Sequence, residues 1–117
     1  MNIIDRPDYT EKVERLFGKG LIIALTGQRR VGKSFIMKQV INKLTSVDAN
    51  NVIYIDKDDE RFGFIRSNIE LTEYVDGRLI VGKNNYLFID EVQNISSFEM
   101  TLRSLHSREA CGIVITD

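Results

Sequence analysis

Between an apolar run and an amphipathic run, the chain reads Gly27-Gln28-Arg29-Arg30-Val31-Gly32-Lys33-Ser34. This segment matches the pattern G-x-x-x-x-G-K-[ST], which is typical of a backbone loop that surrounds phosphate groups. The apolar run before it, residues 21–25, has the length and composition of a strand buried on both faces. The run after it, residues 34–44, carries its apolar side chains at helical spacing. Since the pattern needs a strand before it and a helix after it, the segment predicts a nucleotide-binding loop (P-loop) in a parallel α/β sheet.

Each residue type in this loop has a physical role in holding phosphates. Gly27 and Gly32 allow a tight turn and a close approach of the backbone to phosphate oxygens, because neither has a Cβ that would clash. The backbone N–H groups of residues 31–34 are expected to point at the anion, and the positive end of the following helix adds to the attraction. Lys33 is expected to reach the β- and γ-phosphates, and the Ser34 hydroxyl to bind Mg²⁺.

The variable positions of the loop leave two interpretations open. Arg29 and Arg30 could add positive charge near the phosphates, or they could be solvated and pair with acidic neighbours. Phe35 directly follows the motif and is counted with the nucleotide-binding positions, although with Ile36 and Val40 it fits the core better than a nucleotide platform. The expected nucleotide-binding residues are Gly27, Gln28, Arg29, Arg30, Val31, Gly32, Lys33, Ser34 and Phe35.

A pair of acids forms the second candidate site. Residues 86–89 are apolar and lead directly into Asp90 and Glu91. Burying a carboxylate is costly unless something compensates its charge, and Mg²⁺ held by Ser34 and the nucleotide would compensate Asp90, mainly through a water. Glu91 would then polarise the water that attacks the γ-phosphate. The expected catalytic residues are Lys33, Asp90 and Glu91, with Ser34 and Asp90 as the metal site; the alternative is a pair of acids at a solvated strand end.

Strands and helices alternate along the rest of the chain. The apolar patterns predict strands at residues 21–25, 52–55, 86–89 and 112–116, and helices at residues 8–17, 34–44, 68–74 (with an extension through 80 left open) and 97–106, the last with Ser96 or Ser97 as N-cap. Alternation with connections of these lengths predicts right-handed βαβ units in a three-layer α/β/α fold. Ligands then bind at the carboxyl ends of the strands, where both motifs lie.

Composition narrows the class of protein further. The chain has 117 residues and a formal net charge of −1, so we expect one domain over residues 1–117 and no support for nucleic-acid binding. Its one cysteine, Cys111, fits a reducing cytosol and is expected to be a small buried residue ahead of a strand. No apolar run approaches the roughly 20 residues that cross a bilayer, and no signal segment is visible, so we expect a cytoplasmic location.

Taken together, these motifs resemble those of the AAA-like, additional-strand P-loop ATPases. More narrowly, the chain is similar to a bacterial and archaeal ATP-binding family with an N-terminal AAA domain, often followed by a winged-helix-like region and a C-terminal domain of unknown function. The matching positions are Arg6, Tyr9, the segment Gly27-Gln28-Arg29-Arg30-Val31-Gly32-Lys33-Ser34, residues 56–60, and Asp90-Glu91-Val92-Gln93. The resemblance implies binding of Mg–ATP and its hydrolysis to ADP and phosphate to drive a conformational change. It also implies that Arg6 and Tyr9 could lie near the adenine.

One departure from the family pattern concerns the end of the chain. In the family the fourth strand runs into T-G-S, whereas here Thr116 is followed by Asp117, so Thr116 is a candidate for the position that senses the γ-phosphate. We therefore expect an N-terminal fragment in which the P-loop strand is an exposed edge and hydrolysis is weak. A partner protein or a second copy would bind through regions outside this chain.

Three functions fit these residues. The first is an ATPase, the second a nucleotide-binding regulatory module with little hydrolysis, and the third a P-loop small-molecule kinase. The acid pair favours hydrolysis, because a kinase has no need of a water-activating glutamate beside the metal-binding aspartate. ATP is favoured over GTP, because no guanine-binding [NT]-K-x-D motif is visible late in the chain.

Overall fold

The computed structural model describes residues 2–4, 22–25 and 32–117, and within them it contains one sheet of five strands. The strands are β1 (Asn2–Ile4), β2 (Ile22–Leu25), β3 (Asn50–Asp56), β4 (Asn84–Asp90) and β5 (Gly112–Thr116). They lie side by side in the order β1-β2-β5-β4-β3, and every neighbouring pair is parallel. The carboxyl ends of all five strands therefore meet at one edge of the sheet.

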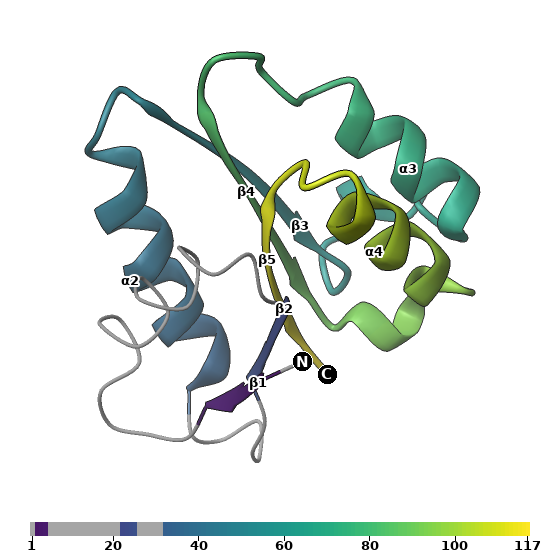
Figure 1. Cartoon of the computed structure of the whole chain (residues 1–117). Coiled ribbons are helices and arrows are strands. Elements are labelled where there is room, and N and C mark those ends of the chain that lie inside the picture. The colour runs from purple at the N-terminus through teal and green to yellow at the C-terminus, as the bar shows by residue number, and fades with distance from the viewer. Residues whose placement is uncertain (1, 5–21, 26–31) are drawn as a thin grey trace.

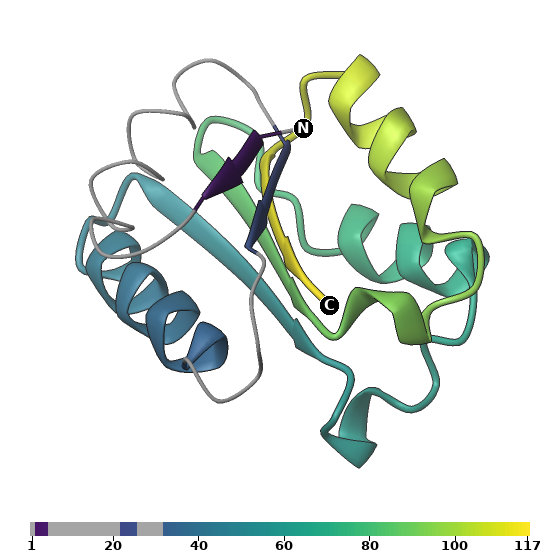
Figure 2. The same ribbon diagram turned by 90° about the horizontal axis from the view of Figure 1, so that it is seen from below.

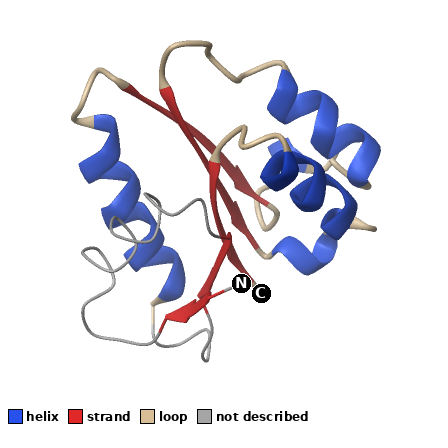
Figure 3. Cartoon of the chain, in the orientation of Figure 1, coloured by secondary structure: helices blue, strands red, loops and turns tan. Residues whose placement is uncertain are grey.

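Helices cover both faces of this sheet. Three α-helices, α2 (Lys33–Thr45), α3 (Asn68–Asp76) and α4 (Phe98–Ser107), and two short 3-10 helices, η2 (Glu60–Phe62) and η3 (Val92–Asn94), are described. Helix α2 packs on one face, and α3 and α4 pack on the other (Figure 1). The view from below in Figure 2 and the colouring by secondary structure in Figure 3 show the sheet between the two helical layers. The predicted three-layer α/β/α fold is confirmed.

Each helical layer has its own apolar core. Toward α2 the buried residues are Ile23, Leu25, Ile36, Met37, Val40, Leu44, Phe88 and Val114. Toward α3 and α4 they include Ile53, Ile55, Leu71, Leu87, Ile89, Leu102, Leu105 and Ile113. Because alternate residues of a strand point to opposite faces, Phe88 of β4 faces α2, whereas its neighbours Leu87 and Ile89 face the other layer. The same alternation puts Asp90 on the α2 face of the sheet.

The position of β2 corrects one expectation from the sequence. The P-loop strand was expected to form an exposed edge, but β1 pairs with it in parallel on the side opposite β5, with Ile4 beside Leu25. In the described sheet the outermost strands are β1 and β3. The sequence did not reveal β1, because a three-residue strand is too short to show a periodic pattern.

The helix boundaries differ from the expected ones in smaller ways. Helix α3 ends at Asp76 and does not extend through residue 80, because the chain turns at Gly77, whose N–H reaches back to the carbonyls of Glu73 and Val75. Ser97 does precede α4, but its side chain makes no capping hydrogen bond and its φ is 55°. The helix expected at residues 8–17 lies outside the described residues, as do Arg6 and Tyr9.

Candidate functional site

The end of the P-loop and the start of α2 form the first half of the site. Gly32 precedes the helix with φ 76° and ψ 37°, a left-handed conformation that favours glycine. Its carbonyl accepts the N–H of Ile36 at 3.0 Å, which closes the first turn. That turn contains no acidic residue, so the positive end of the α2 dipole is not neutralised within the helix and favours an anion.

Most of the predicted phosphate-binding residues lie outside what the structure describes. Gly27, Gln28, Arg29, Arg30 and Val31 are all outside the described residues. For Lys33 and Ser34 the structure describes the backbone, which forms the first residues of α2. Their predicted contacts with phosphate and Mg²⁺ therefore stay predictions.

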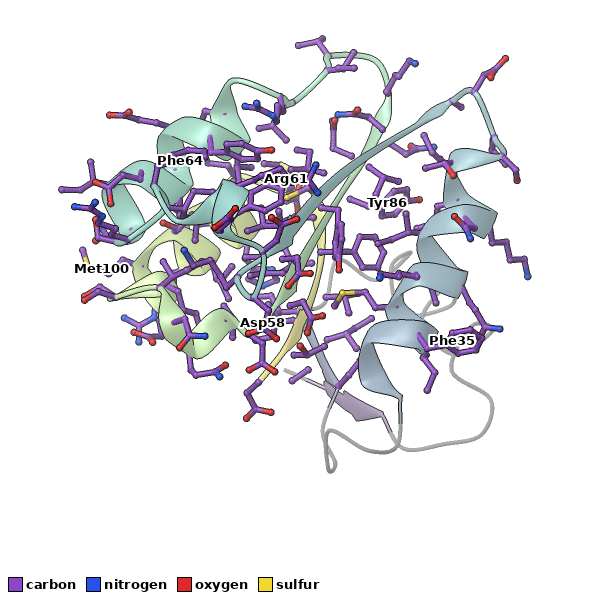
Figure 4. All side chains as sticks on the ribbon, turned by 180° about the vertical axis from the view of Figure 1, so that it is seen from behind. Phe35, Asp58, Arg61, Phe64, Tyr86 and Met100 are labelled. Atoms are coloured by element: carbon purple, nitrogen blue, oxygen red, sulfur yellow. The ribbon has the colours of Figure 1, made fainter. Side chains whose placement is uncertain are left out.

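Phe35 corrects a second expectation. It was expected to pack in the core with Ile36 and Val40, and those two residues are buried, but Phe35 is 64% exposed. Its ring points away from the sheet at the start of α2 (Figure 4). The sequence could not separate these positions, because Phe35 and Ile36 are adjacent and a rotation of about 100° per residue decides which of them faces the sheet. An exposed aromatic ring therefore stands in the first turn of α2, directly after the phosphate-loop motif.

The acid pair at the end of β4 forms the second half of the site. Asp90 is 4% and Glu91 5% exposed, so neither carboxylate is at a solvated strand end. In the sheet register Asp90 lies beside Asp56, the last residue of β3. Both strands end on the edge from which β2 leads toward the P-loop, so Asp56, Asp90 and the start of α2 share the same edge and face of the sheet.

Thr116 ties the acid pair to the neighbouring strand. Its hydroxyl donates to Asp90 Oδ1 and accepts the backbone N–H of Glu91 at 3.1 Å. Thr116 is 1% exposed, and in the register it lies beside Leu25, the last described residue of β2 before the P-loop. Thr116 therefore stands between the strand that leads into the P-loop and the strand that carries the acids. Its hydroxyl fixes the orientation of the Asp90 side chain and of the Glu91 backbone.

Glu91 adopts an unusual backbone conformation. Its φ of 60° and ψ of 51° are left-handed, which a residue with a Cβ adopts at a cost of about 1–3 kcal/mol. The side-chain amide of Gln93 donates to Glu91 Oε2 at 2.5 Å. Strain at a residue persists where the surroundings over-determine it, which is common at functional sites. The D-E-x-Q motif is thus a connected unit in which Gln93 orients the Glu91 carboxylate.

Lys57 was not identified from the sequence, and its side chain connects the acidic loop after β3 to the segment before α3. Lys57 follows Asp56 directly, and its N–H donates to the Asp90 carbonyl at 3.1 Å. Its Nζ donates to the carbonyls of Phe62 and Ile65, both at 2.7 Å, and so holds the acidic loop after β3 against the entry to α3. Burial, with a smaller contribution from the charge of Arg66, lowers the pKa of Lys57. The signal available in the sequence was that Lys57 is the one basic residue within the acidic run 56–60.

The donors present fit Mg²⁺ bound together with a nucleotide. Among the described residues no group of three or more His, Cys, Asp or Glu side chains could hold a metal by itself. Mg²⁺ usually takes only one or two carboxylates and fills its remaining positions with phosphate oxygens and waters. The buried Asp90 carboxylate matches this donor type, and a hydroxyl donor on one of its oxygens fixes its rotation.

The fold and the arrangement of the motifs define the class of protein. A parallel sheet in which a G-x-x-x-x-G-K-S segment connects β2 to α2, and in which β4 ends in Asp90-Glu91, is a P-loop nucleotide-binding domain of the AAA-like class. The family model described as "AAA domain" matches residues 19–117, and the chain belongs to this family. The family resemblance inferred from the sequence is thereby confirmed.

The comparison with curated proteins gives one significant relative. Over 85 residues the chain is 34% identical to an uncharacterized protein of Methanocaldococcus jannaschii. The match covers 73% of this chain but only 18% of the relative, so the chain spans a small part of the length of the protein it matches. No solved structure matches the chain significantly. None of the helices in the described ranges has the length and apolar character needed to span a membrane.

Proposed function

We propose that this domain binds Mg–ATP between the start of α2 and the carboxyl ends of β4 and β5, and hydrolyses it to ADP and phosphate. The observation that carries the proposal is the buried Asp90–Glu91 pair, oriented by Thr116 at the sheet edge where the P-loop begins. Two buried carboxylates have a clear use beside a cation and a water, and none in a purely structural strand end. Hydrolysis needs a group that holds the metal and a group that orients the water, and the two acids fit these two roles.

The proposed roles follow from the chemistry of each residue. The backbone of residues 27–34 and the Lys33 ammonium hold the phosphates, and the Ser34 hydroxyl and Asp90 hold Mg²⁺. Bound Mg²⁺ supplies positive charge that offsets the charge of the phosphate oxygens. Glu91 accepts a proton from, or orients, the attacking water, and the Gln93 amide sets the rotation of its carboxylate.

Phe35 is proposed to contact the base. Its exposed ring stands in the first turn of α2, next to the loop that holds the phosphates. Stacking of a base on an aromatic ring contributes about 1–3 kcal/mol. Such stacking tolerates any base, so the preference for ATP over GTP would have to come from other groups.

The test separates binding from hydrolysis with two single substitutions. Lys33→Ala should abolish nucleotide binding measured by calorimetry, because it removes the charge that faces the phosphates. Glu91→Gln should bind Mg–ATP as the unmodified chain does and release phosphate at least about a hundredfold more slowly, the usual contribution of a general base. Unchanged phosphate release by Glu91→Gln would remove Glu91 from the mechanism.

A regulatory module with little hydrolysis is the second candidate. It is favoured by the hydrogen bond between Gln93 and Glu91, which occupies one of the two carboxylate oxygens that the water could use. In that case Mg–ATP binds and is released unchanged. In either case the nucleotide would come from the cytosol, and a change in conformation would pass to a partner or to a second copy.

A further inference from the structure

The hydroxyl of Tyr54 is buried and has nothing to bond with. It is the one buried side-chain polar atom among the described residues that lacks a hydrogen-bond partner. The ring itself packs against the apolar core under α2. A buried hydroxyl without a partner destabilises the folded state, and native proteins rarely keep one without a reason.

The place of Tyr54 in the sheet puts it on the face, and near the edge, at which the nucleotide is proposed to bind. Tyr54 lies opposite Phe88 in the register, two residues before the pair formed by Asp56 and Asp90. Phe88 faces α2, so Tyr54 lies on the same face as Asp90, one step back from the carboxyl edge. Burial raises the pKa of Tyr54, and the charges of Asp56 and Asp90 raise it further, so the hydroxyl keeps its proton and can donate it.

The nearby carboxylates already have donors of their own. Asp56 Oδ1 accepts the N–H of Asp58 at 3.0 Å, and Asp90 Oδ1 accepts the Thr116 hydroxyl. Around a bound triphosphate these two acids would present only acceptor oxygens. A neutral O–H among them is suited to bond with a further oxygen atom that arrives with the ligand.

We propose that the Tyr54 hydroxyl donates a hydrogen bond to the triphosphate end of bound Mg–ATP, and that it has no partner until the nucleotide binds. The acceptor is an oxygen of the γ-phosphate or of a water held by Mg²⁺. The proposal rests on the proposed function and adds a positioning residue on β3, a strand to which that function assigned no role.

The test is the Tyr54→Phe substitution in the whole chain, with Tyr86→Phe as the matched control. Tyr86 also packs in the core under α2 (Figure 4), but it lies four residues before Asp90 on β4. Thermal unfolding without ligand is measured first. Affinity for a non-hydrolysable ATP analogue and for ADP is then measured by calorimetry, each with Mg²⁺ and with a chelator.

Tyr54→Phe should unfold at a temperature at least as high as the unmodified chain when no ligand is present, because the substitution removes a buried hydroxyl that lacks a partner. It should bind the Mg²⁺-loaded analogue roughly ten- to a hundredfold more weakly, as expected for loss of a hydrogen bond to a charged group. ADP should be affected less. If the loss of affinity for the analogue persists with the chelator, the acceptor of the Tyr54 hydroxyl is the γ-phosphate. If the loss of affinity disappears with the chelator, the acceptor is a water held by Mg²⁺.

Three results would overturn the proposal. One is a lower unfolding temperature of Tyr54→Phe without ligand, since the hydroxyl would then already be bonded. The second is equal affinity of Tyr54→Phe and the unmodified chain for the analogue, which leaves the proposed function intact. The third is a failure of the unmodified chain to bind any nucleoside triphosphate, which removes the proposed function as well.

Discussion

Replacing Thr116 by valine tests whether β5 orients the acid pair. The two side chains have nearly the same shape, so Thr116→Val removes the hydroxyl with little change in packing. It takes away a donor to Asp90 Oδ1 and an acceptor for the Glu91 N–H, in a position that is 1% exposed. A buried hydrogen bond to a charged group contributes about 1.5–3 kcal/mol and one to an amide about 0.5–1.5 kcal/mol.

The extra apolar group of valine offsets part of this loss by about 1 kcal/mol. We therefore expect Thr116→Val to lower the free energy of unfolding by about 2–3 kcal/mol. At about 4 °C per kcal/mol for a domain of this size, Tm should fall by about 8–12 °C. Thermal unfolding followed by far-ultraviolet circular dichroism measures this directly.

Thr116→Ser is the control, because it keeps the hydroxyl and loses only a methyl group, at about 1 kcal/mol. The serine variant should also keep any phosphate release that the unmodified chain shows, whereas the valine variant should lose most of it. A valine variant as stable as the unmodified chain, or more stable than the serine variant, would show that the Thr116 hydroxyl does not hold Asp90 and Glu91.

Three further predictions concern α2 and α3. Phe35→Ala should weaken ATP binding by about 5- to 100-fold, because that is the loss expected when a base no longer stacks on the exposed ring. The affinity for inorganic tripolyphosphate, which has no base, should stay unchanged. Equal losses of affinity for the two ligands in calorimetry would exclude a contact between Phe35 and the base. Helix α3 begins with a capping box in which the Ser67 side chain accepts the N–H of Ile69 at 3.2 Å and Glu70 Oε1 accepts the N–H of Ser67 at 2.8 Å. Ser67→Ala should therefore lower the free energy of unfolding by about 1 kcal/mol in urea titrations, and no loss would mean that the cap is not formed. Hydrogen bonds from Ser67 hold the pKa of Glu70 below its ordinary 4.5, so the stabilisation by the Glu70 carboxylate is complete above about pH 4.5 and is lost as the pH falls through the lower folded-state pKa. The difference in stability between the unmodified chain and Glu70→Ala should shrink over that range, and a difference independent of pH would contradict the capping role of the carboxylate.

Local pattern was enough to predict most of the framework. Residues 52–55 and 86–89 are unbroken apolar runs, and both lie within strands, because a strand covered on both faces needs apolar side chains throughout. Gly32 was expected to allow a tight turn at the end of the loop, and its φ of 76° is a left-handed conformation that favours glycine. Asp90 and Glu91 stood out because two acids directly after four apolar residues conflict with burial unless they have a use.

The amino-acid sequence by itself determined the class of the domain, since each motif is a run of adjacent residues whose chemistry needs no distant partner to be recognised. Only the tertiary structure decided how the site is held. Thr116 lies 26 residues from Asp90 along the chain, and Tyr54 lies 34 residues from Phe88, so their contacts depend on strand order and register. The same holds for β1, which pairs with the edge of β2 that was expected to be exposed. Hydrogen bonding across a sheet brings such residues together, and no local pattern records which strands become neighbours.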